Sequence, residues 1–165
     1  MERNISQDRI WHKIIRQLNK HRVDYVLVGE AALIIHGMPR ATLDIDICVR
    51  ARTGCLIQLF KIADSLGLHS DQKSILAMKD SPKLFENQWA CFSFQKQDVM
   101  DVFFTDDKTF SKLFRNSELK KDKSLAIRVA SLKDIAAMKK SSRRAVDLSD
   151  VAYIEEIKRL QKTRT

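Results

Sequence analysis

Residues 43–49 alternate strictly between apolar side chains and others, in the order Leu-Asp-Ile-Asp-Ile-Cys-Val. On a β-strand, side chains two residues apart project from the same face. Ile45 and Ile47 are therefore expected to point into a core, while Asp44 and Asp46 leave the opposite face. The segment predicts a half-buried strand that carries two carboxylates on its polar side.

The rest of the chain predicts helices and strands in mixed order. Gly29 follows a short β-branched stretch as a turn between strand and helix, and residues 95–98 join two apolar arms like a hairpin. Strands are expected at residues 23–28, 43–49, 90–94, 99–104 and 124–129. Helices are expected at residues 7–21, 30–36, 54–66, 109–116, 132–140 and 147–160. Since no linker or repeat divides the chain, residues 1–165 predict one α/β (α+β) domain with a mixed sheet flanked by helices.

The charge balance favours an anionic partner. Thirty Lys and Arg against 21 Asp and Glu leave a formal net charge of +9, which favours nucleic acid or nucleotide. The basic clusters crowd into the C-terminal half, where each cluster alone is more typical of a solvated helix face.

The apolar segments and the cysteines indicate a cytoplasmic protein with no membrane partner. No apolar run reaches the roughly 18 residues that a membrane span needs, and the polar start is unlike a signal peptide. Cys48, Cys55 and Cys91 form no CxxC pair, so they are expected to be structural thiols rather than zinc ligands or redox groups.

Three aspartates are the candidate metal ligands. Asp44 and Asp46 would repel each other without a cation, and Mg²⁺ is commonly held by one or two carboxylates together with substrate phosphate oxygens. Taken alone, this pair is more typical of the polar face of a half-exposed strand. Asp101, however, lies in a second apolar strand, VMDVFF, where a carboxylate is costly unless paired or metal-bound. The three residues predict a Mg²⁺ or Mn²⁺ site in which Asp101 also accepts a proton from an attacking hydroxyl.

The residues before the aspartates suit a phosphate group. The Gly29 turn offers backbone N–H groups and the positive end of a helix dipole to an anion. Arg40 and Thr42 add a cation and a hydroxyl for phosphate oxygens. His36, on a short apolar helix, is expected to be a hydrogen-bonded packing residue rather than a catalyst.

The run Val28-Gly29-Glu30, a spacer, Asp44-Ile45-Asp46 and a later Asp101 resembles the signature of the DNA polymerase β-like nucleotidyltransferase superfamily. More narrowly, VGEAALIIHGMPRATLDIDICV and SLKDIAAMKKSSRRAVDLSDV are similar to the small nucleotidyltransferases related to the abortive-infection toxin of type IV toxin-antitoxin systems.

The resemblance implies that an NTP is the substrate and that a cognate antitoxin protein is a partner. It also implies that Lys139, and with it Arg143 and Asp147, approach the nucleotide or stabilise the site. The alternative for Lys139 is a basic helix end stabilised by the helix dipole.

Glu30 departs from the family pattern, which has Gly or Ser at that position. Glu30 stands at a predicted nucleotide-binding position together with Gly29, Arg40, Thr42 and Lys139, but a carboxylate there would repel a triphosphate. The alternatives are that Glu30 turns outward, or that it satisfies the helix N-terminus and occupies the anion site itself. Nucleotide affinity is therefore the part of the prediction that Glu30 puts in question.

Two functions from different classes follow. The first is Mg²⁺-dependent transfer of NMP from an NTP to a hydroxyl acceptor, with tRNA or other RNA favoured by charge and a protein or small molecule also open. The second is a catalytically degenerate nucleotidyltransferase fold that binds RNA or protein. A third reading, an unrelated α/β domain with surface aspartates, also stays open.

Overall fold

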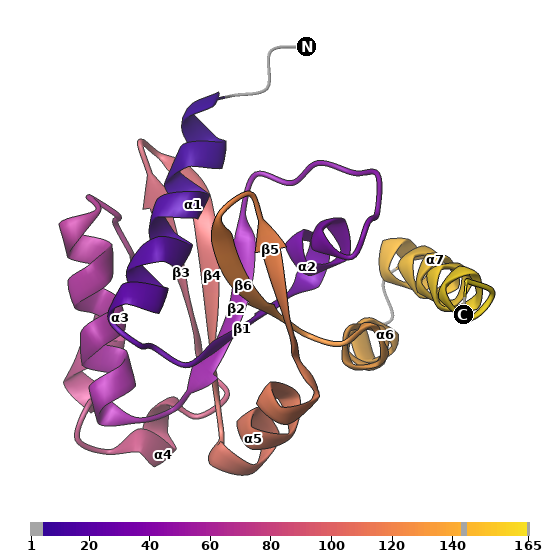
Figure 1. Cartoon of the computed structure of the whole chain (residues 1–165). Coiled ribbons are helices and arrows are strands. Elements are labelled where there is room, and N and C mark those ends of the chain that lie inside the picture. The colour runs from indigo at the N-terminus through magenta and orange to yellow at the C-terminus, as the bar shows by residue number, and fades with distance from the viewer. Residues whose placement is uncertain (1–4, 143–144, 165) are drawn as a thin grey trace.

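Six strands form one mixed sheet in the order β3-β4-β2-β1-β6-β5. The computed structural model describes residues 5–142 and 145–164 (Figure 1). The central strands β1, β2 and β4 bring together the Gly29 turn and the three aspartates. The strands are β1 (Tyr25–Val28), β2 (Ile45–Arg50), β3 (Trp89–Phe94), β4 (Gln97–Thr105), β5 (Glu118–Asp122) and β6 (Leu125–Val129).

Strand directions follow from the connections. β1 runs antiparallel to β2 and parallel to β6, and β2 runs parallel to β4. β3 with β4 and β5 with β6 are antiparallel hairpins at the two edges. The helices are α1 (Ile5–Lys20), α2 (Gly29–Ile35), α3 (Thr53–Ser65), α4 (Pro82–Phe85), α5 (Asp107–Asn116), α6 (Leu132–Ser142) and α7 (Ala145–Lys162), with a 3₁₀ helix η1 (Lys73–Met78).

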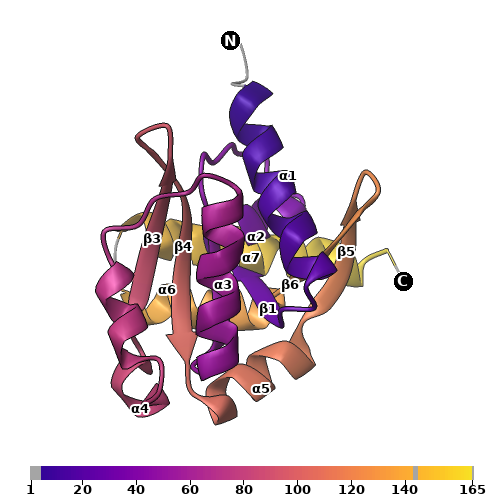
Figure 2. The ribbon, with the colours of Figure 1, turned by 90° about the vertical axis from the view of Figure 1, so that its left-hand side faces the viewer.

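Helices lie on both sides of the sheet. Figure 1 shows the sheet close to edge-on, with α1 and α3 on one side and α2, α6 and α7 on the other. In the perpendicular view of Figure 2, α1 and α3 lie in front of the strands and α6 and α7 cross behind them. Helices α1 and α3 therefore cover one face of the sheet, and α2 with the C-terminal pair α6 and α7 covers the other.

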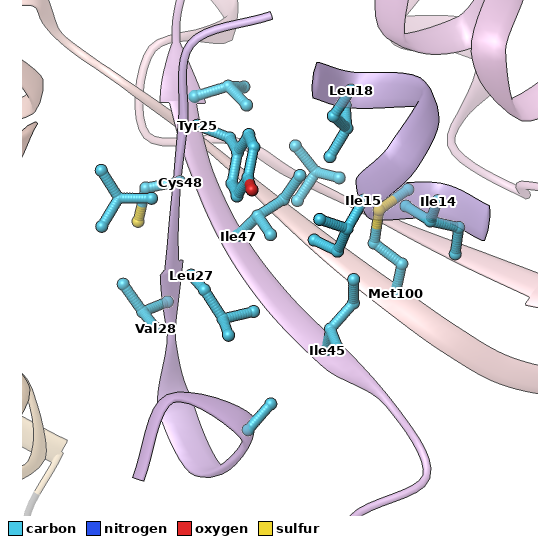
Figure 3. Packing of buried hydrophobic residues seen from close by; sticks show 14 of the residues in the cluster. Ile14, Ile15, Leu18, Tyr25, Leu27, Val28, Ile45, Ile47, Cys48 and Met100 are labelled. Atoms are coloured by element: carbon cyan, nitrogen blue, oxygen red, sulfur yellow. The ribbon is translucent and has the colours of Figure 1, made fainter. Parts of the chain in front are cut away.

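The hydrophobic core between α1 and the sheet explains the alternation in β2. Ile14 and Ile15 of α1 and Ile45 and Ile47 of β2 are fully buried, and Figure 3 shows them facing one another. Cys48 points away from α1 in the same view. Since side chains two residues apart share a face, Asp46 lies on the face opposite α1, as the sequence predicts.

The fold prediction is confirmed for the mixed α/β sheet and its flanking helices, but three elements were missed. The segment of β5 is polar and mostly exposed, so it lacks the apolar alternation that marks a strand. It pairs with β6 as an edge hairpin. The short elements η1 and α4 lie in residues 68–89, where the apolar pattern is weak.

Within residues 5–142 and 145–164, no helix combines the length and apolar character that a membrane crossing requires.

Candidate active site

The carboxylates of Asp44, Asp46 and Asp101 converge. Asp46 and Asp101 are direct partners across the parallel strands β2 and β4, and Asp44 immediately precedes β2. One oxygen from each of the three lies within 4.8 Å of the others, and all three residues are partly buried. The Thr42 hydroxyl donates a hydrogen bond of 3.0 Å to Asp44 Oδ1, so Thr42 contacts the cluster itself.

The three negative charges are held where full ionisation is unfavourable. Burial is the main cause that raises the pKa of Asp46 to about 7, and the charges of Asp101 and Asp44 raise it further, while Lys139 opposes them. Burial is also the main cause of the raised pKa of Asp101. A divalent cation would relieve this repulsion, and oxygen ligands at this spacing suit Mg²⁺ or Mn²⁺. The residues therefore fit the metal that the sequence predicts.

Cys91 contacts the cluster, which the sequence analysis missed. It pairs with Asp101 across β3 and β4, so the two side chains share one face of the hairpin. Burial, followed by the neighbouring Asp101 carboxylate, raises the pKa of the thiol. The hairpin register was the signal that could have placed Cys91 beside Asp101. The three cysteines are free thiols.

Gly29 allows the closest approach to the cluster. Its φ is +69°, and a Cβ built on it would lie 2.2 Å from Asp46 Oδ2. Any other residue would be strained by the backbone angle and would also displace the carboxylate. Gly29 therefore makes room for the side chain of Asp46, in addition to turning the chain from β1 into α2.

A second group of charges surrounds two buried carboxylates. Asp147 and Asp150 are each 2% exposed. Lys139 Nζ lies 3.2 Å from Asp147 Oδ1 and 2.9 Å from Asp150 Oδ2. Arg40 Nη2 lies 3.0 Å from Asp150 Oδ1, as an ion pair rather than an aligned hydrogen bond. Arg40 also donates a 2.8 Å hydrogen bond to Glu30 Oε1. This charge network, Glu30, Arg40, Lys139, Asp147 and Asp150, connects α2 with α6 and α7.

The charge network shows which partners bind the predicted site residues Glu30 and Lys139. Glu30 is paired with Arg40, so its charge is partly neutralised. Lys139 bonds to aspartates of α7 and still lowers the pKa of Asp46, so it acts electrostatically on the carboxylate cluster. Asp150 was missed by the sequence analysis. Its spacing of three residues from Asp147, on one helix face, was the available signal. Arg143 lies outside the described residues.

His36 has the structural role expected of it. Its Nε2 is 2.8 Å from the carbonyl oxygen of Ala130, and burial lowers its pKa.

A cavity of about 390 Å³ lined by Arg22, Arg50 and Arg52 contains none of the three aspartates. It lies at the other end of β2, so it belongs to a different part of the molecule.

The mixed sheet thus brings Asp44 and Asp46, at the start of β2, beside Asp101 of β4 and the Gly29 turn. The family described as "Nucleotidyltransferase of unknown function (DUF6036)" matches residues 10–162, and the chain belongs to this family. A search of curated protein sequences gave no significant match.

Several solved structures share the fold. A Thermotoga maritima protein described as a candidate nucleotidyltransferase matches 97% of this chain and 95% of its own, with a TM-score of 0.58 and 13% identity. ANT(2″)-Ia in complex with adenylyl-2″-tobramycin matches 96% of each chain, with a TM-score of 0.59 and 13% identity. JHP933 from Helicobacter pylori matches 94% of this chain and 67% of its own, with a TM-score of 0.59 and 14% identity. At these identities the likeness establishes the fold alone.

Gly29→Ala is expected to weaken divalent metal binding by displacing Asp46. Gly67→Ala is the matched control, because Gly67 has a similar φ of +72° but open space where its Cβ would lie. Both variants should lose stability from backbone strain, by about 1 kcal/mol or more, but only Gly29→Ala should lose Mn²⁺ affinity in a titration. Equal Mn²⁺ affinity in the two variants would refute this role for Gly29.

The raised pKa of Asp46 predicts a pH dependence of stability without metal. The folded state holds the Asp46 proton up to about pH 7, whereas the unfolded chain releases it near about pH 3.9. This group therefore favours folding fully below about pH 4, and that contribution is lost as the pH rises to about 7. Asp46→Asn keeps a neutral side chain, so its stability relative to the parent should rise across this window and then level off. Urea unfolding in EDTA at several pH values measures the difference, and a pH-independent difference would contradict it.

Proposed function

We propose that this chain transfers a nucleoside monophosphate from an NTP to a hydroxyl acceptor in a reaction that depends on Mg²⁺ or Mn²⁺. The observation that carries the proposal is the convergence of Asp44, Asp46 and Asp101, with oxygens within 4.8 Å of one another. Structural ion-pair networks also gather carboxylates, but here three acids lie together with Lys139 as the cation that acts on Asp46. Membership of a nucleotidyltransferase family supports the same reaction class.

In this proposal Asp44, Asp46 and Asp101 hold the metal. A bound divalent ion would supply positive charge to phosphate oxygens and stabilise the charge that develops during transfer. The Gly29 turn and Lys139 orient the triphosphate, and Thr42 fixes Asp44 through its hydrogen bond.

Asp101 is the proposed acceptor of the proton from the attacking hydroxyl. The hydroxyl oxygen forms a bond to the α-phosphorus, the bond from that phosphorus to the bridging oxygen breaks, and pyrophosphate leaves. A carboxylate with a raised pKa is better matched to this proton transfer than an ordinary one.

We propose that the Glu30 carboxylate competes with a substrate phosphate group for Arg40. The two side chains are 2.8 Å apart, so a phosphate group that reaches Arg40 must replace the Glu30 carboxylate. Glu30→Ser is expected to leave the fold intact and to tighten NTP binding in calorimetric titrations with Mg²⁺. Glu86→Ser is a control, since Glu86 pairs with Lys83 on α4 instead. Equal or weaker NTP binding by Glu30→Ser would exclude this competition.

RNA is the acceptor that we favour, because the net charge of +9 attracts a phosphate backbone. A small molecule is the alternative that a fold neighbour supports, since ANT(2″)-Ia is described with adenylyl-2″-tobramycin. The proposal includes a place in a toxin-antitoxin pair, with a cognate protein that restrains the enzyme. This part rests on the sequence resemblance alone.

The direct test uses NTPs labelled at the α- or at the γ-phosphate. The purified protein is incubated with each labelled NTP, Mg²⁺ and total tRNA, and the RNA is then separated. We expect label from the α-phosphate and not from the γ-phosphate to enter the RNA, and Asp46→Asn to reduce the transfer by at least about a hundredfold.

Other outcomes discriminate between the functions. Label from the γ-phosphate would indicate phosphoryl transfer and contradict the proposal. RNA binding without transfer, unchanged by Asp46→Asn, would favour the degenerate binding module that the position of Glu30 suggests.

A further inference from the structure

Two large aromatic side chains are exposed on the edge hairpin of the sheet. Trp89 is 48% exposed and Phe103 is 40% exposed. They are direct partners across the antiparallel strands β3 and β4, and the next pair of the same kind is Cys91 with Asp101. In an antiparallel pair, opposed side chains share a face, and so do side chains two residues apart. Trp89 and Phe103 therefore project from the same face as Asp101.

The intervening residues confirm which face this is. Phe92 and Phe104 alternate with the exposed aromatics and are 1% exposed. Phe92 packs on Phe60 of α3 with ring centroids 5.1 Å apart, and Phe104 packs on Phe85 with centroids 5.6 Å apart. The buried rings thus belong to the α3 side of the sheet. The exposed aromatics belong to the side that carries the aspartates.

The aromatic pair lies beyond Asp101 as seen from the Gly29 turn. Across the sheet, Gly29 follows β1, Asp46 is on β2, Asp101 is on β4, and Trp89 is on the edge strand β3. Along β4, Phe103 is two residues from Asp101, a distance of about 7 Å. Trp89 and Phe103 therefore form an exposed aromatic surface directly beside the third aspartate of the candidate site.

The geometry of the transfer reaction predicts that the acceptor binds on the β3 and β4 side of the site. The attacking hydroxyl and the leaving pyrophosphate lie on opposite sides of the phosphorus during an in-line displacement. With the triphosphate toward Gly29 and the proton acceptor at Asp101, the hydroxyl arrives from the direction of β3 and β4. An acceptor that enters there passes over Trp89 and Phe103.

We propose that Trp89 and Phe103 form a stacking platform for unpaired bases next to the reacting hydroxyl of a single-stranded RNA acceptor. The inference rests on the proposed function and names its substrate class. Flat aromatic rings bind bases of any sequence through their faces, while a positive protein charge attracts the backbone. The net charge of +9 provides that attraction, whereas a cationic small molecule would gain nothing from it.

The chain provides its own reporter for this contact. It contains two tryptophans, and Trp11 is buried in the α1 core, so Trp11→Phe leaves Trp89 as the single fluorophore. This variant is titrated with oligoadenylate of about ten nucleotides, and with an abasic ribose-phosphate oligomer of equal length and charge. We expect oligoadenylate to quench Trp89 and the abasic oligomer to bind at least about tenfold more weakly.

A pair of double variants separates stacking from general surface effects. Trp89→Ala/Phe103→Ala should weaken oligoadenylate binding about tenfold or more in a filter-binding assay. Leu84→Ala/Leu119→Ala removes apolar side chains that are 61% and 62% exposed outside this pair, and it should bind as the parent does. The conservative variant Trp89→Phe should retain binding, and circular dichroism checks that each variant is folded.

Three results would overturn the inference. The first is equal binding of the two oligomers, and the second is unchanged RNA binding by folded Trp89→Ala/Phe103→Ala. The third is conversion of a dimer to a monomer by that variant with RNA binding intact, which would make the pair an interface between copies.

NTP binding by the unaltered protein distinguishes this failure from failure of the proposed function. If NTP binds with Mg²⁺ but oligoadenylate does not quench Trp89, the stacking inference alone fails. If oligoadenylate quenches Trp89 but no NTP binds at millimolar concentration, the transferase proposal fails and the pair is no longer an acceptor site.

Discussion

Electrostatic repulsion among Asp44, Asp46 and Asp101 is the constraint on which the rest of the site depends. A sheet can hold three carboxylates this close only because burial on its other face fixes the strands. Ile45 and Ile47 are fully buried against α1, and a slip of one residue in β2 would exchange them with the aspartates. Hydrophobic burial thus sets the register, and the register sets the distance between Asp46 and Asp101. Burial first, and then the charges of Asp101 and Asp44, raise the pKa of Asp46 in this position.

Neighbouring residues make specific contacts with each of the three aspartates. Gly29 leaves space for the Asp46 side chain, the Thr42 hydroxyl donates a hydrogen bond to Asp44, and Cys91 lies beside Asp101 on the same face of the hairpin. Further out, Lys139 and Arg40 are paired with the buried carboxylates of α7. Removing one partner from such a buried network leaves a charge without compensation, which is costly. The C-terminal helices are therefore tied to the active-site face by charge as well as by packing.

Much of this arrangement could be predicted from the sequence because it follows strong local patterns. The alternation in residues 43–49 and the apolar surroundings of Asp101 were enough to place Asp46 and Asp101 on strands, with Asp44 directly before the first of them, and to bring the three together. The prediction was less complete where geometry depends on the partner strand or on distant residues. The contact of Cys91 with Asp101 depends on hairpin register, and the pairing of Arg40 with Asp150 joins residues 110 positions apart. The edge strand β5 was missed because its exposed, charged sequence has no apolar face.

The central claim, that these three aspartates form a divalent metal site, is tested most directly by Mn²⁺ titration followed by electron paramagnetic resonance. The free Mn²⁺ signal reports binding without any assumption about the nucleotide or the acceptor. The unaltered protein should bind Mn²⁺, and Asp44→Asn, Asp46→Asn and Asp101→Asn should each weaken binding about tenfold or more, by the loss of one charged ligand. Glu118→Gln, at an exposed carboxylate of β5, should bind as the parent does. Mn²⁺ binding that is unchanged in all three aspartate variants would contradict the account.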